Sequence, residues 1–214
     1  ELAEKEGKSF WFRARNELIA WAFKKHSAAA RTFLELGCGT GFVIQGLAKR
    51  FPHLDCFASE LLPEGLQFAQ KRVPDATFIQ VDARKLPFYC QFDAIGAFDV
   101  IEHIEEDEQV ISSVYDSLVP GGLFLITVPQ HPWLWGPNDE LACHVRGYTA
   151  RDLRAKLERA QFKIEECCAF VSWLLPLLVM SRFVQKFNRN GWNSRREMDA
   201  TTSLPILESV MQME

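Results

Sequence analysis

Residues 32–42 have the sequence TFLELGCGTGF, an apolar run that turns abruptly glycine-rich, and an amphipathic run follows from Val43 to Arg50. This order predicts a strand, a tight loop and a helix. Glycine allows positive φ angles and lets a ligand approach the backbone without a Cβ in the way. Because the N–H groups at a helix N-terminus favour negative charge, we expect the loop to bind a ligand with a nucleoside or an anionic end.

The glycine spacing excludes two common nucleotide-binding loops. The dinucleotide fingerprint G-x-G-x-x-G requires a third glycine where Phe42 stands, and the phosphate-binding loop requires Gly-Lys before a Ser or Thr. The observed order is Glu35 followed by Gly37, Gly39 and Gly41. An acidic residue followed by G-x-G-x-G resembles the first motif of the class I S-adenosylmethionine (SAM)-dependent methyltransferases.

Length and composition fit one α/β domain with a sizeable core, because the 214 residues are 48% hydrophobic and 24% charged. The net charge of -4 disfavours nucleic acid as the main partner. The six cysteines contain no C-x-x-C pair, so we expect reduced core thiols, a cytoplasmic protein and no zinc site. The chain begins at Glu1 without a signal peptide, and we expect it to be a fragment.

Further strands alternate with helices along the chain. Four more apolar runs predict strands at 55–60, at 77–81, within 92–103 and at 123–128, and helices are expected at 8–25, 63–72, 108–118 and 149–160. This alternation predicts a doubly wound, mostly parallel α/β sheet that binds ligands at the carboxyl ends of its strands. A sixth strand is expected at 162–170.

Acidic residues follow the second and third predicted strands. Glu60 lies 23 positions after Gly37, and a nucleoside-binding βαβ unit places a ribose-binding carboxylate about 20 positions on. A carboxylate suits the ribose diol because it accepts two O–H donors. By resemblance to the methyltransferases, Asp82 meets the adenine amino group, with the backbone of Ala83 beside it.

The resemblance extends over about residues 10–170. The pattern F-D-x-I-x-x-x-x-V-x-E-H runs from Phe92 to His103, and L-x-P-G-G begins at Leu118. The subgroup it resembles is the type 11/12 methyltransferases, including the ubiquinone-biosynthesis type. The resemblance implies a Rossmann-like fold, SAM as cofactor with S-adenosylhomocysteine as product, and a cofactor site formed by Glu35, Gly37, Cys38, Gly39, Gly41, Glu60, Leu61, Asp82, Ala83 and Phe98.

The acceptor side is expected in two other segments. The loop 129–148 is aromatic and polar, and we expect it to form the substrate wall with Trp133, Trp135 and Tyr148. The helix 8–25 is expected to cover the sheet or to act as a lid, with Trp11 and Arg13 near the substrate. The acceptor is expected to be a small molecule methylated at oxygen, with a hydrophobic or lipid-like compound included in that range.

Methyl transfer to a hydroxyl requires removal of its proton, and histidine suits that task at neutral pH. The candidates are His103, His131 and His144. Asp99-x-x-Glu102-His103 also resembles the E-x-x-E-H set of methyltransferases that hold a divalent metal beside a 2′-hydroxyl, with His131 or His144 as a fourth ligand. Asp99 replaces the usual Glu, so we expect no metal. The sequence also leaves open a nucleic-acid methyltransferase and a non-catalytic SAM-fold binding subunit.

The segment 171–214 is expected to be an extension of the domain 1–170 or an interface. The apolar run 171–180 is too short to span a bilayer and predicts a buried helix or a peripheral membrane contact. A helix is expected at 204–213, and 188–202 should be the least ordered part. No segment predicts the seventh strand usual in this fold. We therefore expect the sixth strand, the tail or a second copy in a homodimer to cover the edge of the fifth strand.

Overall fold

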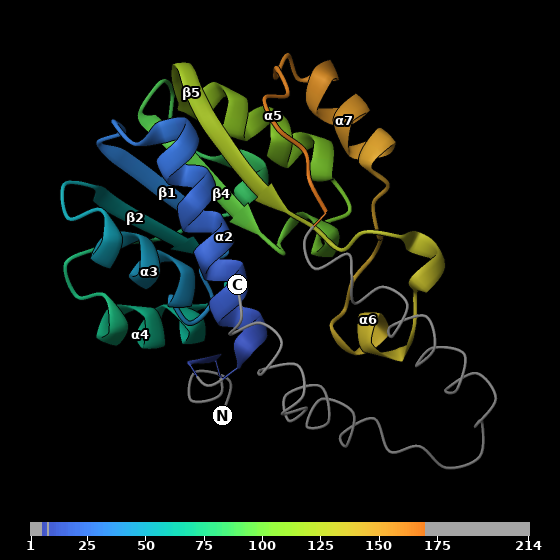
Figure 1. The fold of residues 1–214 in the computed structure, drawn as a ribbon, viewed down its shortest axis with the longest axis horizontal. Coiled ribbons are helices and arrows are strands. Elements are labelled where there is room, and N and C mark those ends of the chain that lie inside the picture. The colour runs from blue at the N-terminus through green and yellow to red at the C-terminus, as the bar shows by residue number, and fades with distance from the viewer. Residues whose placement is uncertain (1–5, 8, 170–214) are drawn as a thin grey trace.

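The computed structural model describes residues 6–7 and 9–169, and its described part contains one sheet of five parallel strands in the order β3-β2-β1-β4-β5 (Figure 1). In chain order these strands are β1 (Thr32–Leu36), β2 (Asp55–Glu60), β3 (Thr77–Gln80), β4 (Phe92–Phe98) and β5 (Leu118–Thr127). Leu36 pairs in register with Ser59 of β2 and Ala97 of β4, so the carboxyl ends of these three strands lie level. The strand order reverses between β1 and β4, and a crevice for a ligand is expected there.

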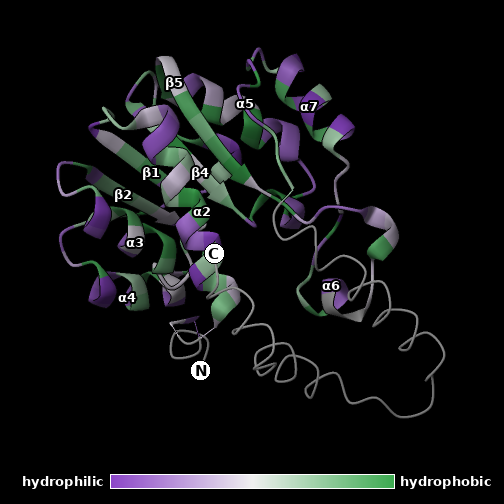
Figure 2. Cartoon of the chain, viewed as in Figure 1, coloured by the Kyte–Doolittle hydropathy of each residue, from purple (hydrophilic) through white to green (hydrophobic). Residues whose placement is uncertain are grey.

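Helices cover both faces of the sheet (Figure 1). On one face lie α2 (Phe10–Ser27), α3 (Phe42–Arg50) and α4 (Pro63–Arg72), and on the other α5 (Asp107–Ser117) and α7 (Ala150–Arg159). Alternate strand residues enter the two cores: Phe33 and Ala58 pack beneath α2–α4, whereas Leu34, Ile95 and Phe124 pack beneath α5 and α7. Figure 2 shows these strands as apolar and the outer sides of the helices as polar.

Local signals set several helix starts. Pro63 occupies the first turn of α4, where its missing N–H costs nothing. Thr149 caps α7, because its hydroxyl accepts the backbone N–H of Asp152 at 3.1 Å. Gly41 precedes α3 in the left-handed conformation, with φ 77°. The structure confirms the helices predicted at 63–72 and 149–160 and the strand predicted at 55–60. The helix 63–72 and the strand 55–60 have the predicted first and last residues.

Several predictions were wrong in detail. The strand predicted at 123–128 begins earlier, because β5 pairs with β4 from Leu118 onwards and includes residues 120–122 at a register shift. Residues 162–169 form no strand, although Phe162 packs near Phe124 with ring centroids 5.5 Å apart. The loop 129–148 contains two short helices, η3 (Pro132–Leu134) and α6 (Pro137–Leu141). Of the six cysteines, which are all free, only Cys38 and Cys56 are buried.

Within the described residues β5 pairs with β4 alone, so the expected cover of its outer edge stays a prediction. The predictions for the apolar run 171–180, the polar stretch 188–202 and the helix 204–213 concern residues outside the described part, as does the boundary at 170. No helix in the described ranges is long and apolar enough to cross a membrane.

Candidate functional site

The loop after β1 forms an open cradle beside the crevice. Gly37 and Gly39 both have positive φ angles, of 60° and 49°, and a Cβ on Gly39 would meet nothing within 4 Å. A Cβ on Gly37 would lie 2.7 Å from a methyl of Val100, so the β1 loop and the residues after β4 pack directly together. The open side of Gly39 is space for a ligand, whereas Gly37 permits the close approach of two loops.

Glu60 closes the cradle at the end of β2. Its Oε2 accepts the backbone N–H of Gly39 at 3.1 Å, and its Oε1 accepts those of Leu61 and Leu62 at 2.8 and 3.3 Å. A carboxylate has about four acceptor sites, so this one retains capacity for a ligand hydroxyl. The side chain of Leu61 is exposed beside it and offers an apolar surface.

Asp82 follows β3 and caps the short helix η1 (Ala83–Lys85), since its Oδ1 accepts the backbone N–H of Arg84 at 2.9 Å. The Arg84 guanidinium also donates to both Asp82 oxygens and to Glu106. These hydrogen bonds hold the pKa of Asp82 below its ordinary value. An adenine amino group would therefore share or displace the Arg84 contacts.

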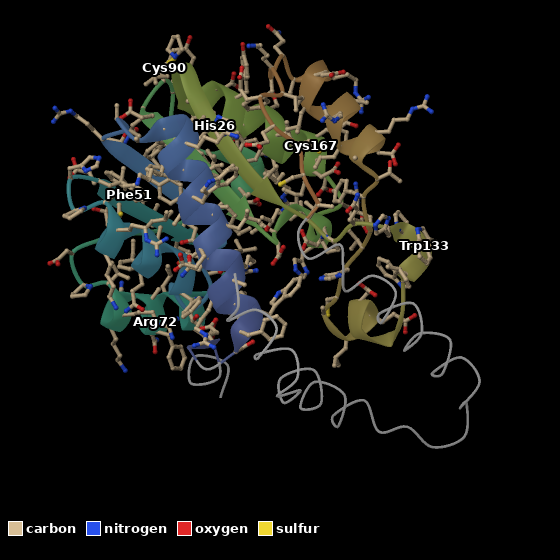
Figure 3. The ribbon with its side chains drawn as sticks, viewed as in Figure 1. His26, Phe51, Arg72, Cys90, Trp133 and Cys167 are labelled. Carbon is tan, nitrogen blue, oxygen red and sulfur yellow. The ribbon has the colours of Figure 1, made fainter. Side chains whose placement is uncertain are left out.

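The N-terminal segment crosses this edge of the sheet. Glu6 is buried and accepts the Thr40 hydroxyl of the glycine loop at 2.6 Å and Arg72 at 2.8 Å (Arg72 is labelled in Figure 3). Further along, Arg15 of α2 donates to Asp99, which follows β4 with a φ of 57° and also accepts the Thr127 hydroxyl at 2.9 Å. α2 is thus tied by side-chain contacts to the ends of β4 and β5.

Glu35, on β1, is buried beneath the cradle. Burial raises its pKa to about 8, and the nearby Arg15 opposes this rise. Its Oε2 has no hydrogen-bond partner. A carboxyl group in this environment is largely protonated at neutral pH unless a positive charge comes close.

A cluster of titratable side chains lies next to Asp99. Glu102 and His103 occupy the short helix η2 (Ile101–His103) after β4, and His144 comes from the segment after β5. The backbone N–H of Val145 donates to the carbonyl of Glu102 at 2.8 Å, which brings the two segments together. The His103 and His144 rings meet edge to face with centroids 4.8 Å apart, and His144 Nδ1 lies 3.2 Å from Asp139 Oδ1.

Burial shifts the pKa values of Glu102 and His103. Glu102 is fully buried, neither of its carboxylate oxygens has a hydrogen-bond partner, and burial together with Asp99 raises its pKa to about 8. Burial, with His144 nearby, lowers the pKa of His103. A neutral imidazole is the form that can accept a proton or ligate a metal.

A buried polar network anchors the segment that carries His144. The Tyr148 hydroxyl donates to Asp107 at 2.7 Å, and Arg146 and Lys156 also pair with that carboxylate. Burial alone would raise the pKa of Asp107, but these partners, with Lys156 first, hold it below its ordinary value. The network joins α5 and α7 to residues 146–148, so it fixes where His144 lies.

A cleft of about 1280 Å³ runs along the outer edge of β5, and we call it the β5 groove. Its floor is β5, its sides include α2, α7 and residues 161–169, and much of its lining is apolar. At the carboxyl end of the strand it is lined by Trp11, Arg15, Phe98, Asp99, Glu102, His131 and His144. The groove therefore reaches from the residues that follow β4 to the amino end of β5, and its lining includes Phe98, Asp99 and Glu102 but no residue of the glycine loop.

Comparison with known proteins agrees with this geometry. A methyltransferase domain model matches residues 33–122, which begin in β1 and end within β5. The chain contains a class I SAM-dependent methyltransferase domain. SAM is the cofactor of this domain, and the residues fit it: the glycine loop is open at Gly39, and the Glu60 carboxylate at the end of β2 retains acceptor capacity.

The relatives of this chain are distant. A probable SAM-dependent methyltransferase of Mycolicibacterium smegmatis is 29% identical over 165 residues, which are 74% of this chain and 61% of that protein. The dTDP-3-amino-3,4,6-trideoxy-alpha-D-glucopyranose N,N-dimethyltransferase of Streptomyces venezuelae is 30% identical over 124 residues, covering 56% and 49%. The chain thus spans about half to three-fifths of the length of these relatives.

A solved structure supports the fold. The YcgJ protein of Bacillus subtilis superimposes with a TM-score of 0.64 at 16% identity, covering 85% of this chain and 87% of that one. At this identity the likeness establishes a shared fold and nothing finer.

The predicted cofactor residues of the methyltransferase lie where strand ends meet. Glu35 and Cys38 are buried, Gly37, Gly39 and Gly41 form the loop, and Phe98 is the last residue of β4. The binding of SAM by each residue stays a prediction. Asp82 accepts hydrogen bonds from Arg84 in this structure.

The predicted acceptor residues are more widely spread than the predicted cofactor residues. His144 and Trp11 line the β5 groove with His131, which begins η3 with a φ of 68°, whereas His103 stands behind His144. Trp133 is 64% exposed on a segment that projects away from the sheet (Figure 3). Trp135 lies near His144, with ring centroids 6.4 Å apart.

Two predicted acceptor residues, Tyr148 and Arg13, lie in other surroundings than the rest, and their contact with an acceptor stays a prediction. Tyr148 lines the β5 groove but is almost fully buried, and its hydroxyl donates to Asp107. Arg13 is exposed and lies outside the groove lining, where Arg15 stands instead. Helical spacing carries the signal for Arg15, because Trp11 and Arg15 are four residues apart and share one face of α2.

Sequence reasoning also missed Asp139 as the partner of His144. The two residues are five positions apart across the end of α6, and no regular periodicity links them. Glu102 was noted only as part of a metal-binding resemblance, whereas its burial makes it a central group of the site.

Proposed function

We propose that this chain transfers the methyl group of SAM to a hydroxyl group of a small, partly apolar acceptor bound in the β5 groove. The observation that carries the proposal is the continuity of the two sites. The loop at Gly37 packs on Val100, and the nearby residues Asp99 and Glu102 line the mouth of the groove. A cofactor in the cradle and an acceptor in the groove would therefore meet at the carboxyl end of β4.

SAM supplies an electrophilic methyl group on a positively charged sulfur, and its transfer to an acceptor oxygen leaves S-adenosylhomocysteine. The protein must align the acceptor, exclude water and receive the hydroxyl proton. The apolar lining of the groove and α2, held by Arg15 on Asp99, serve alignment and exclusion of water.

His144 is the best-placed base among the three predicted histidines. It lines the groove, and its Nδ1 contact with Asp139 orients the ring. His103 stands behind it, with its ring edge to face against that of His144, and burial lowers the pKa of His103, so this ring is the weaker proton acceptor. His131 lines the same groove from the start of η3 and is the alternative base.

An amine is the second candidate acceptor, and one observation favours it. The Streptomyces venezuelae relative is named as an N,N-dimethyltransferase of an amino sugar nucleotide. An unprotonated amine needs no base before transfer, so its methylation would depend less on the histidines than that of a hydroxyl.

The test is SAM turnover on matched acceptors. The purified protein is incubated with labelled SAM and paired alcohols and amines of equal apolar size, and S-adenosylhomocysteine and methylated product are measured. We expect product from the alcohols, with a requirement for His144 or His131. Turnover confined to the amines would mean that the acceptor atom is nitrogen and not oxygen. SAM binding without product from any acceptor, including a cell extract followed by mass spectrometry, would contradict the enzymatic proposal and favour a binding subunit.

A further inference from the structure

We propose that Glu102, His103 and His144 bind a divalent transition-metal ion of the Zn²⁺ type at the mouth of the β5 groove. One ligand atom from each side chain lies within 4.8 Å of the others. Around a tetrahedral ion with bonds of about 2.1 Å, ligand atoms lie about 3.4 Å apart, so binding draws these side chains closer. The three residues come from two segments, after β4 and after β5, which Val145 joins by its backbone hydrogen bond to Glu102.

The buried carboxylate of Glu102 is the observation that points to a cation. Its side chain is 0% exposed, and both of its oxygens lack a hydrogen-bond partner. A buried polar group without a partner costs free energy, and a buried charge costs more. Of the buried side chains in the described ranges, Glu102 alone has both carboxylate oxygens without a partner. A metal ion bound to this carboxylate would supply the missing partner.

The environment of His144 is that of a metal ligand. Its Nδ1 faces the Asp139 carboxylate at 3.2 Å, which leaves the other ring nitrogen for a ligand. Metal-binding histidines commonly give their second nitrogen to a carboxylate in this way, and the contact fixes the tautomer and the ring orientation. Asp139 is itself held, because it accepts the backbone N–H of Gly136 at 2.9 Å.

The donor set selects the kind of metal. Two imidazoles and one carboxylate favour zinc, cobalt, nickel or iron over magnesium, which prefers an all-oxygen octahedron. Three protein ligands leave a position open for a water or a substrate oxygen, as in catalytic zinc sites. Asp99 stands outside the set, because its oxygens accept Arg15 and Thr127.

The role of such an ion rests on the proposed function, whereas its binding does not. A metal at this place would lie at the groove end where the acceptor hydroxyl is proposed, and it would lower the pKa of an oxygen bound to it. His131 would then remain as the histidine of the groove that is not a ligand.

The test is metal binding by the untagged protein after treatment with a chelator. Zn²⁺ binding is measured by calorimetry, and Co²⁺ is added separately to record its visible absorption bands. We expect one ion per chain. Glu102→Gln and His144→Gln should each weaken Zn²⁺ binding by more than 100-fold, and Asp139→Asn by about 10- to 100-fold. His131→Gln and His26→Gln are the matched controls and should bind Zn²⁺ as the parent does.

Binding of S-adenosylhomocysteine to each variant reports whether the fold is intact. No Zn²⁺ or Co²⁺ binding by the parent, while S-adenosylhomocysteine still binds, would overturn the metal proposal and leave the proposed function standing. Unchanged Zn²⁺ affinity in both Glu102→Gln and His144→Gln would overturn it equally. If a ligand variant loses both Zn²⁺ and S-adenosylhomocysteine binding, two other measurements decide the question. Tetrahedral Co²⁺ bands in the parent and a weaker Zn²⁺ affinity in Asp139→Asn support the site. The absence of both refutes it.

Discussion

Glu35→Gln should make the stability of the protein less sensitive to pH. Glu35 lies on β1 beneath the glycine loop, and burial raises its pKa from the ordinary 4.5 to about 8. In the unfolded chain the carboxyl is ionised above pH 4.5, so between pH 4.5 and 8 folding takes up a proton. Stability is therefore greatest, for this group, below pH 4.5 and falls as the pH rises towards 8.

The size of the effect follows from the pKa difference. Each pH unit in this window lowers the free energy of unfolding by about 1.4 kcal/mol per such group, and the whole window amounts to about 5 kcal/mol. Glutamine has nearly the shape of the protonated acid and does not ionise. The variant should thus lose this slope, and its stability relative to the parent should rise steadily from pH 5.5 to pH 7.5.

The assay is urea unfolding of the ligand-free protein at half-unit steps of pH, with a reductant present for the six free thiols. Glu64→Gln, on the exposed side of α4, is the matched control for the loss of one carboxyl. It should leave the slope as in the parent, because an exposed carboxyl meets similar surroundings in both states. Parallel stability curves for the parent and Glu35→Gln would refute the reasoning that Glu35 takes up a proton on folding.

Three further outcomes are expected. Glu60→Ala should weaken S-adenosylhomocysteine binding by about 1.5–3 kcal/mol in calorimetry, because it removes a charged acceptor, whereas Glu64→Ala should not. If the parent and Glu60→Ala bind with equal affinity, Glu60 is not part of the ribose site. At least one of His103→Ala, His131→Ala and His144→Ala should lower kcat by about 10²–10⁴ with cofactor binding intact, and full turnover in all three would mean that positioning alone suffices. Tyr148→Phe should cost about 1.5–3 kcal/mol of stability, because its hydroxyl donates to the buried Asp107; a change in the urea midpoint of the opposite sign would contradict this.

Much of the fold could be predicted from the sequence because its signals are local. The glycine loop, Pro63 in the first turn of α4 and Thr149 before α7 each fix a boundary through the backbone of a few residues. The segment 162–169 shows the limit of such signals. Its composition suits a strand, but a strand needs a neighbour to pair with, and residues 163–169 make no backbone hydrogen bond to β5 in the described structure.

The candidate site could be predicted only where it follows strand ends. Glu60 was predicted from its spacing after Gly37, and Asp82 from the family resemblance and its place after a strand. The structure places both at the carboxyl ends of strands, and their binding of the cofactor stays a prediction. Arg84 on Asp82 and Asp139 on His144 were not found, because side-chain pairs in short helices and loops leave no periodic pattern. Burial of Glu102 was equally hidden, since it depends on the segment after β5 folding back over η2.

The charges around the crevice explain why this site suits a cationic ligand. Glu35 is buried under the loop and Asp99 stands at the end of β4, and the arginine close to both is Arg15, whose guanidinium is bound to Asp99. Glu35 therefore stays protonated until more positive charge arrives. A ligand with a positively charged centre in the cradle would favour the ionised carboxylate and gain its attraction, whereas the product, which lacks the sulfonium charge, would not. We therefore expect the same buried carboxyl, which weakens the empty fold at high pH, to favour release of the product over the cofactor.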